Sequence, residues 1–265
     1  MSQAQQAGQV LLETKAHIAW VTLSHPGKLN ALSAGMWRQI QDIFTTLSQD
    51  TDLRAVVLRG EGGNFAAGAD ISEFPRLRAD FEGVFNYHTR IIAPALRAVA
   101  ECPHPVLAQI EGVCVGGGLE VASQCDLRIA GASARFGVPI SRLGFSMAPH
   151  EMRGLLALAG RSVTLEILYE GRIFEAAEAK DKGLLNRVVP DEQVHEEVAR
   201  SLARITRGAP LAARLNKQTA RLLSPEPAAL SEAELRAAFA YADSRDHQEG
   251  VRAFLAGEEP VFKGV

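Results

Sequence analysis

The chain has 265 residues, 47% of them hydrophobic and 22% charged, so it is long enough to bury a large core. Its net charge of -3 lacks the basic excess of a nucleic-acid-binding domain, so we expect a small-molecule ligand and no nucleic acid. The three cysteines have no C-x-x-C spacing, which argues against a disulfide framework and a zinc site. The sequence shows neither an apolar run of membrane length nor a signal-peptide pattern, so we expect a soluble cytoplasmic protein.

Strands and helices alternate in the first two thirds of the chain. Residues 9–26 contain two β-rich runs separated by a polar break, which is typical of a hairpin. Ser33 can cap a helix over 34–49, because apolar residues recur there at helical spacing. Further elements are expected at 53–60 (strand), 61–74 (a loop whose end begins a helix), 82–101 (a helix broken or kinked at Pro94), 104–115 (strand), Gly117 or Gly118 onward (helix) and 125–131 (strand).

From about residue 149 the pattern becomes almost entirely helical. Three short segments read as helices that each stop at a glycine, 150–160, 162–171 and 174–183. A last strand at 184–190 is followed by amphipathic helices at 191–208, 210–224 and 231–257. This order predicts an α/β fold with a helical C-terminal part.

Three consecutive glycines, Gly116 to Gly118, end a predicted strand and are followed at once by the acid Glu120. The run is not a dinucleotide fingerprint, because Val121 stands where the last glycine belongs, and it is not a P-loop. A helix N-terminus without side chains can direct backbone N–H groups at an anion or a developing oxyanion, although a tight strand-to-helix junction explains the glycines equally well. Glu120 is either a first-turn residue beside the helix dipole or a partly buried carboxylate with a raised pKa.

Two further matches to catalytic motifs fail. His150 and Glu151 begin like a zinc-binding H-E-x-x-H motif, but the second histidine is missing, so no metal site is expected. Residues 144–148 nearly form the G-x-S-x-G motif of a serine hydrolase, but the last glycine is replaced, which leaves a Ser146–His150 pair as a minority hypothesis.

Several longer runs resemble the crotonase superfamily, also called the enoyl-CoA hydratase/isomerase family. They are "HPGKLNALS" (25–33), "GGNFAAGADISEF" (62–74), "HPVLAQIEGVCVGGGLEVASQCDLRIAGASARFGVP" (104–139), "GRIFEAAEAKDKGLLNRVVP" (171–190) and the tail "EGVRAFLAGEEPVFKG" (249–264). The resemblance implies a crotonase-type spiral of ββα turns over residues 1–195, followed by a helical trimerisation region over 196–265. It also implies a homotrimer or hexamer that binds an acyl-CoA substrate and needs no cofactor besides the coenzyme A of that substrate.

The resemblance assigns roles to individual residues. The N–H groups of Ala69 and Gly117 match the oxyanion hole that holds the thioester oxygen as an enolate forms, and Glu120 matches the first of two catalytic glutamates. Coenzyme A would be bound by Lys28, Leu29, Ala31, Ala67, Asp70 and Ile71, with Phe262 and Lys263 reaching the coenzyme A of a neighbouring subunit.

The sequence departs from the hydratase pattern at one position. Ile140 follows Pro139 where a hydratase has its second glutamate, and His150 or Glu151 are candidate replacements as acid or base. The prediction is an enoyl-CoA hydratase/isomerase-type enzyme that forms a thioester enolate. Alternatives are an isomerase that uses Glu120 alone, a decarboxylase of the methylmalonyl- or ethylmalonyl-CoA type, and a non-catalytic acyl-CoA-binding protein. Four apolar residues at helical spacing either line an acyl pocket or are ordinary core residues: Phe74, Leu77, Phe81 and Phe85.

Overall fold

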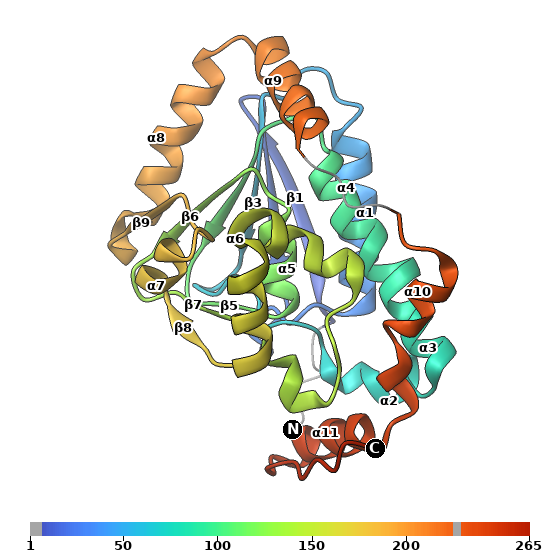
Figure 1. The fold of residues 1–265 in the computed structure, drawn as a ribbon. Helices are drawn as coiled ribbons and strands as arrows, with labels where there is room; N and C mark the ends of the chain where they lie inside the picture. The colour runs from blue at the N-terminus through green and yellow to red at the C-terminus, as the bar shows by residue number, and fades with distance from the viewer. Residues whose placement is uncertain (1–6, 225–228) are drawn as a thin grey trace.

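Two β-sheets form the centre of the computed structural model, which describes residues 7–224 and 229–265 (Figure 1). The larger sheet is antiparallel only between its first two strands, as the predicted hairpin requires, and parallel elsewhere. Its strands, in spatial order, are β1 (Gln9–Lys15), β2 (Ile18–Ser24), β3 (Ala55–Gly60), β4 (Val106–Ile110), β6 (Leu127–Gly131) and β9 (Arg187–Val189). The smaller sheet contains β5 (Val113–Val115), β7 (Arg135–Gly137) and β8 (Phe174–Glu175).

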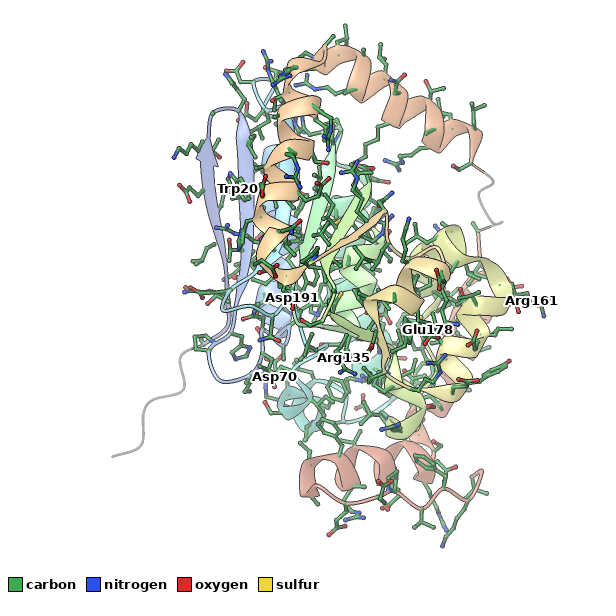
Figure 2. All side chains as sticks on the ribbon, turned by 90° about the vertical axis from the view of Figure 1, so that its left-hand side faces the viewer. Trp20, Asp70, Arg135, Arg161, Glu178 and Asp191 are labelled. Carbon is green, nitrogen blue, oxygen red and sulfur yellow. The ribbon has the colours of Figure 1, made fainter. Side chains whose placement is uncertain are left out.

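Helices cover both faces of the larger sheet. Helices α1 (Ala34–Leu47) and α4 (Ala93–Glu101) pack together over the main hydrophobic core, on one side of the sheet. Helix α8 (Val194–Arg207) covers the other side, where Val198 and Leu202 form a second core with the strands and Trp20 packs at its edge (Figure 2). Almost all of α8 belongs to the predicted C-terminal region, yet the helix packs on the sheet. The expected boundary at residue 195 stays a prediction.

The other helical segments follow here in chain order. They are η1 (Ile71–Glu73), α2 (Phe74–Leu77), α3 (Phe81–Asn86), η2 (Tyr87–Ile92), α5 (Gly117–Ser123), η3 (Pro139–Leu143), α6 (Pro149–Glu170), α7 (Ala176–Asp181), η4 (Asp191–Gln193), α9 (Pro210–Leu223), α10 (Glu232–Ala237), η5 (Ala240–Asp243) and α11 (Arg245–Ala256). Within the described ranges, every helix is too short or too polar to cross a membrane.

Local signals predicted several elements correctly. The Ser33 hydroxyl accepts from the Met36 N–H at 3.2 Å and caps α1, as expected. Helix α5 begins at Gly117, directly after the triglycine.

The predicted helix over 82–101 differs from the structure in the position of its break. The chain widens into a π-helix, η2, before Pro94, and Pro94 is the second residue of α4. π-Helical turns are often found at functional sites. Here the turn carries Tyr87 and His88, which both line a cavity described below.

Three other predicted elements are divided or joined differently. The strand over 104–115 is split into β4 and β5, in separate sheets, by a turn at Gly112 with φ +54. The segments 150–160 and 162–171 form one helix, α6, with a kink at Gly160. The helix over 231–257 is three pieces, because Ser244 accepts from the His247 N–H at 3.1 Å and starts a new helix there.

Candidate active site

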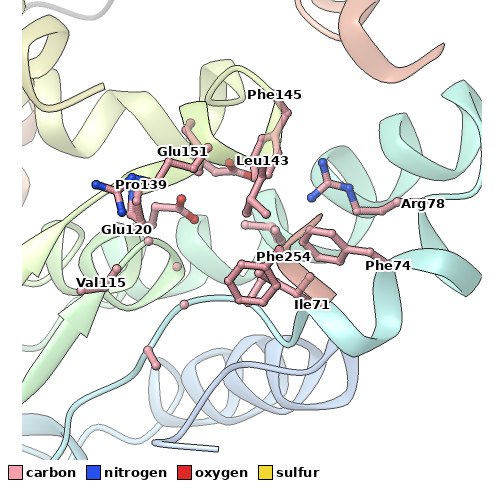
Figure 3. A pocket seen from close by; sticks show the side chains of 18 of the residues that line it. Ile71, Phe74, Arg78, Val115, Glu120, Pro139, Leu143, Phe145, Glu151 and Phe254 are labelled. Carbon is pink, nitrogen blue, oxygen red and sulfur yellow. The ribbon is translucent and has the colours of Figure 1, made fainter. Parts of the chain in front are cut away.

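A cavity of about 340 Å³ lies where the loop before η1, the start of α5, the π-helix and the first turn of α6 meet. Most of its lining is apolar, and Phe74, Phe145 and Phe254 contribute aromatic rings (Figure 3). The ionisable groups that line it include Glu120, Glu151 and Arg78. Concave, mostly apolar sites with a few polar groups are typical of small-molecule binding sites.

The triglycine brings two backbone segments into close contact beside this cavity. Gly116 has φ +51, a conformation that glycine adopts easily, and Gly118 leaves no room for a side chain, since an added Cβ would lie 2.3 Å from the Ala66 carbonyl oxygen. A Cβ added to Gly117 would lie 3.6 Å from the Ala69 nitrogen, so the two amides are neighbours. Among the described residues, neither the Ala69 nor the Gly117 N–H has a hydrogen-bond acceptor, and both residues line the cavity.

Glu120 lies in the first turn of α5 and is almost completely buried. Burial raises the pKa of its carboxyl well above the usual value, repulsion from Glu151 raises it further, and Arg78 opposes the shift. A first-turn glutamate on the surface would interact with the helix dipole and stay ionised. The buried position instead makes Glu120 able to carry a proton near neutral pH.

Glu151 lies in the first turn of α6 and enters the same cavity, where Figure 3 places its side chain beside that of Glu120. Burial raises the pKa of Glu151 to about 8, against the attraction of Arg78. Its Oε1 lies 2.5 Å from His88 Nδ1. Burial lowers the pKa of His88 well below its usual range, so the ring is neutral and the contact is a hydrogen bond that orients the carboxyl.

The two carboxyl groups make stability depend on pH. Glu151 has a pKa of about 8 in the folded state and an ordinary pKa in the unfolded state, so the unfolded state loses this proton at a lower pH. Between the two pKa values the folded state binds more protons, and the free energy of unfolding therefore falls as pH rises towards 8. We therefore expect Glu151→Gln to raise the melting temperature, with an advantage that is absent near pH 4.5 and grows up to pH 8–9. Thermal unfolding at several pH values checks this, with the exposed Glu192→Gln as the control. A pH-independent difference would contradict the assigned burial of the charge.

The predicted site residues fall into two groups. Those that line the cavity are Ala67, Ala69, Ile71, Gly117, Glu120, Ile140 and Glu151. Outside it, the Lys28 ammonium and Asp70 form an ion pair at 2.7 Å, Leu29 is exposed, and Ala31 is half-buried. Phe262 and Lys263 are exposed beyond α11, with the Lys263 N–H donating to Asp246.

The hypothesis of a serine hydrolase gains no support. Ser146 donates to the carbonyl oxygen of Ala238 at 3.0 Å, and within the described part of the chain no hydrogen bond joins it to His150. Of the two candidate replacements for the missing glutamate, the structure brings Glu151 to Glu120 and leaves His150 half-buried outside the cavity lining.

The sequence did not single out Arg78 and Tyr87, and it assigned no function to His88. Nothing in the run "FPRLRADF" distinguishes one buried arginine from its exposed neighbours. Of the four apolar residues considered for an acyl pocket, Phe74 lines the cavity, whereas Phe81 and Phe85 pack with Phe239 in a separate core.

The α/β fold holds a cavity that combines two amides without acceptors and two buried carboxyl groups, an arrangement that suits chemistry at a carbonyl group. The family model "Enoyl-CoA hydratase/isomerase" matches residues 13–265, and the chain belongs to this family, within the crotonase superfamily.

Relatives and solved structures agree with this membership. The chain is 34% identical over 253 residues to "Putative enoyl-CoA hydratase/isomerase YngF" of Bacillus subtilis, covering 94% of this chain and 95% of that one. Its structure resembles an enoyl-CoA hydratase/carnithine racemase from Magnetospirillum magneticum, with 45% identity, a TM-score of 0.80 and coverage of 98% and 97%. It also resembles a methylmalonyl-CoA decarboxylase in complex with 2-nitronate-propionyl-CoA, with 27% identity, a TM-score of 0.85 and coverage of 97% and 99%.

Proposed function

We propose that this enzyme adds water to the double bond of 2-enoyl-CoA thioesters. The observation that carries the proposal is the second buried carboxyl group. Ile140 cannot act as the second acid or base, but Glu151 enters the same cavity from α6 and interacts electrostatically with Glu120. The chain thus keeps two carboxyl groups although the usual position of one is lost.

In the proposed reaction, the N–H groups of Ala69 and Gly117 donate to the thioester oxygen. The ionised member of the Glu120–Glu151 pair takes a proton from water, and the hydroxide oxygen adds to C3. Electrons of the double bond move onto the thioester oxygen to form the enolate. The protonated member then donates its proton to C2, which completes the addition of water. Mutual repulsion and burial favour one proton on the pair near neutral pH, which supplies one base and one acid.

Binding of the coenzyme A part is proposed from the family pattern. Lys28, Leu29, Ala31, Ala67, Asp70 and Ile71 would contact it, with Phe262 and Lys263 of a neighbouring subunit in a trimer or hexamer. No separate cofactor takes part in this scheme, because coenzyme A belongs to the substrate.

Decarboxylation is the second candidate. It is favoured by the apolar Ile140 after Pro139 and by the similarity to the methylmalonyl-CoA decarboxylase structure. Loss of CO₂ needs a stabilised enolate but no strong base. It gives no role to a second carboxyl group beside Glu120, which is why hydration is preferred.

A substrate panel tests the proposal. Purified protein is expected to remove the enoyl absorbance of crotonyl-CoA, and methylmalonyl- or ethylmalonyl-CoA is expected to release no CO₂. A 3-enoyl-CoA measures isomerisation in the same panel. Release of CO₂ without hydration would replace the proposal by decarboxylation, and tight binding of acyl-CoA with no turnover of any substrate would indicate a non-catalytic binding protein.

A further inference from the structure

One buried charge in the cavity neither donates to the thioester oxygen nor carries a proton in the proposed addition of water. Arg78 follows α2 and is only 6% exposed. Its guanidinium carbon lies 4.1 Å from the centre of the Phe74 ring and 4.4 Å from that of Phe145, so the planar group is held by aromatic rings. Figure 3 shows the guanidinium pointing into the cavity from the side opposite Glu120.

Arg78 is poorly paired within the protein. Its Nη2 donates to the Tyr241 hydroxyl at a long 3.4 Å, and its Nε is buried without a partner. Across residues 7–224 and 229–265 no carboxylate forms an ion pair with it, whereas the half-buried Arg172 and the exposed Arg252 each pair with glutamates. A buried charge without a matching partner is costly, which indicates that a partner is missing from the free enzyme.

The histidine and tyrosine side chains around Arg78 carry no charge that could balance it. Burial lowers the pKa of His88 well below its usual range and that of His247 to about 4, so both rings are neutral. Burial raises the pKa of Tyr87 and of Tyr241, so both phenols are neutral as well. Two carboxyl groups in the cavity, Glu120 and Glu151, interact with this cation, but their shared negative charge is needed to activate water.

A second donor faces the same space. The Tyr87 hydroxyl is buried and has no hydrogen-bond partner in the described chain, and Tyr87 lines the cavity from the π-helix. A guanidinium whose Nε has no acceptor and a phenol without a partner match a carboxylate, which accepts several hydrogen bonds at once.

We propose that Arg78, assisted by the Tyr87 hydroxyl, binds a second carboxylate on the acyl group, so that the preferred substrates are enoyl-CoA thioesters of dicarboxylic acids. This inference rests on the proposed hydration and names its substrate class. The position of Arg78 across the cavity from Glu120, among Phe74 and Phe145, assigns it to the acyl group rather than to the phosphates of coenzyme A. A carboxylate bound by arginine is stabilised as an anion and retained, which also disfavours loss of CO₂.

Binding of saturated analogues tests the inference without turnover. Glutaryl-CoA and butyryl-CoA differ by one carboxylate, as do adipyl-CoA and valeryl-CoA, and the two pairs allow for chain length. At least one diacid is expected to bind roughly tenfold to hundredfold more tightly than its partner by calorimetry, since a charge-assisted hydrogen bond has that effect. Arg78→Met should abolish this difference in affinity between diacid and monoacid thioesters. An unchanged affinity for butyryl-CoA and an unchanged melting temperature serve as the controls for folding. Arg78→Lys should keep part of it.

The matched control removes a different cation. Arg161 lies on α6, and Figure 2 shows it at the outer surface, so Arg161→Met should leave the diacid preference unchanged. Equal affinity of wild-type protein for both members of both pairs, or a preference that survives in Arg78→Met, would overturn the inference.

Turnover separates this inference from the proposed function. Glutaconyl-CoA is crotonyl-CoA with an added carboxylate, and the ratio of kcat/KM for glutaconyl-CoA to that for crotonyl-CoA should fall roughly tenfold to hundredfold in Arg78→Met. The ratio is the readout because loss of the Arg78 charge also changes the pKa of Glu120 and Glu151, and this change affects both substrates alike. Hydration of crotonyl-CoA with no effect of Arg78 on any diacid would refute the substrate class alone. A diacid preference in binding with no hydration of either substrate would support Arg78 as the carboxylate-binding residue and refute hydration.

Discussion

Replacing Glu120 or Glu151 by glutamine is expected to lower kcat for crotonyl-CoA hydration by roughly 10²–10⁴, which is the usual contribution of a general acid or base. Glutamine keeps the size of the side chain but neither takes nor supplies the proton. Because both carboxyl groups lie in the cavity and their charges interact, each should be needed for turnover. Affinity for butyryl-CoA should change little, so initial rates from enoyl absorbance are to be compared with dissociation constants.

The double variant Glu120→Gln/Glu151→Gln distinguishes a pair that acts as a unit from two independent groups. Its rate should be close to that of the slower single variant, because removing one member already removes the acid or the base. The exposed Glu192→Gln is the control and should be fully active. If Glu151→Gln alone kept wild-type hydration, Glu151 would not be the second catalytic group and a reaction through Glu120 alone would be favoured.

Features that depend on neighbouring residues could be predicted from the sequence. The Ser33 cap and the start of α5 at Gly117 were both predicted, because capping and the loss of side chains act within a few residues. Glu120 could be placed beside the glycines for the same reason, because it lies only a few residues after them in the same helix. The runs that carry the resemblance to the family contain these local features.

Features that depend on packing between distant segments could not be predicted in this way. His150 and Glu151 were equal candidates, since successive residues of a helix point in different directions and only the docking of α6 decides which one enters the cavity. Arg78 is buried because Phe145, far along the chain, covers it. The helix predicted over 231–257 is divided where Phe239 packs in a core with Val84 of α3, and the local Ser244 cap then starts a new helix.

Adding a methyl group at Gly118 is expected to reduce kcat/KM by roughly 10² or more. The new Cβ would lie 2.3 Å from the Ala66 oxygen, and that carbonyl is fixed because it accepts from the Val115 N–H at 3.0 Å. The clash must therefore move the loop that carries Ala69 away from α5, which separates the two amides proposed to bind the thioester oxygen. Loss of one such donor, or a displacement of about 1 Å, costs roughly that factor in rate.

Gly62→Ala is the matched control for this substitution, because it lies earlier on the same loop and has open space around it. Its φ of +66 adds roughly 1–2 kcal/mol of backbone strain without a clash, so it tests loop strain alone. Steady-state rates and melting temperatures of both variants separate the effects, and Gly62→Ala should stay close to wild type in kcat/KM. A folded Gly118→Ala with wild-type activity would mean that the spacing of the Ala69 and Gly117 amides does not control catalysis, and the enolate mechanism would lose its structural basis.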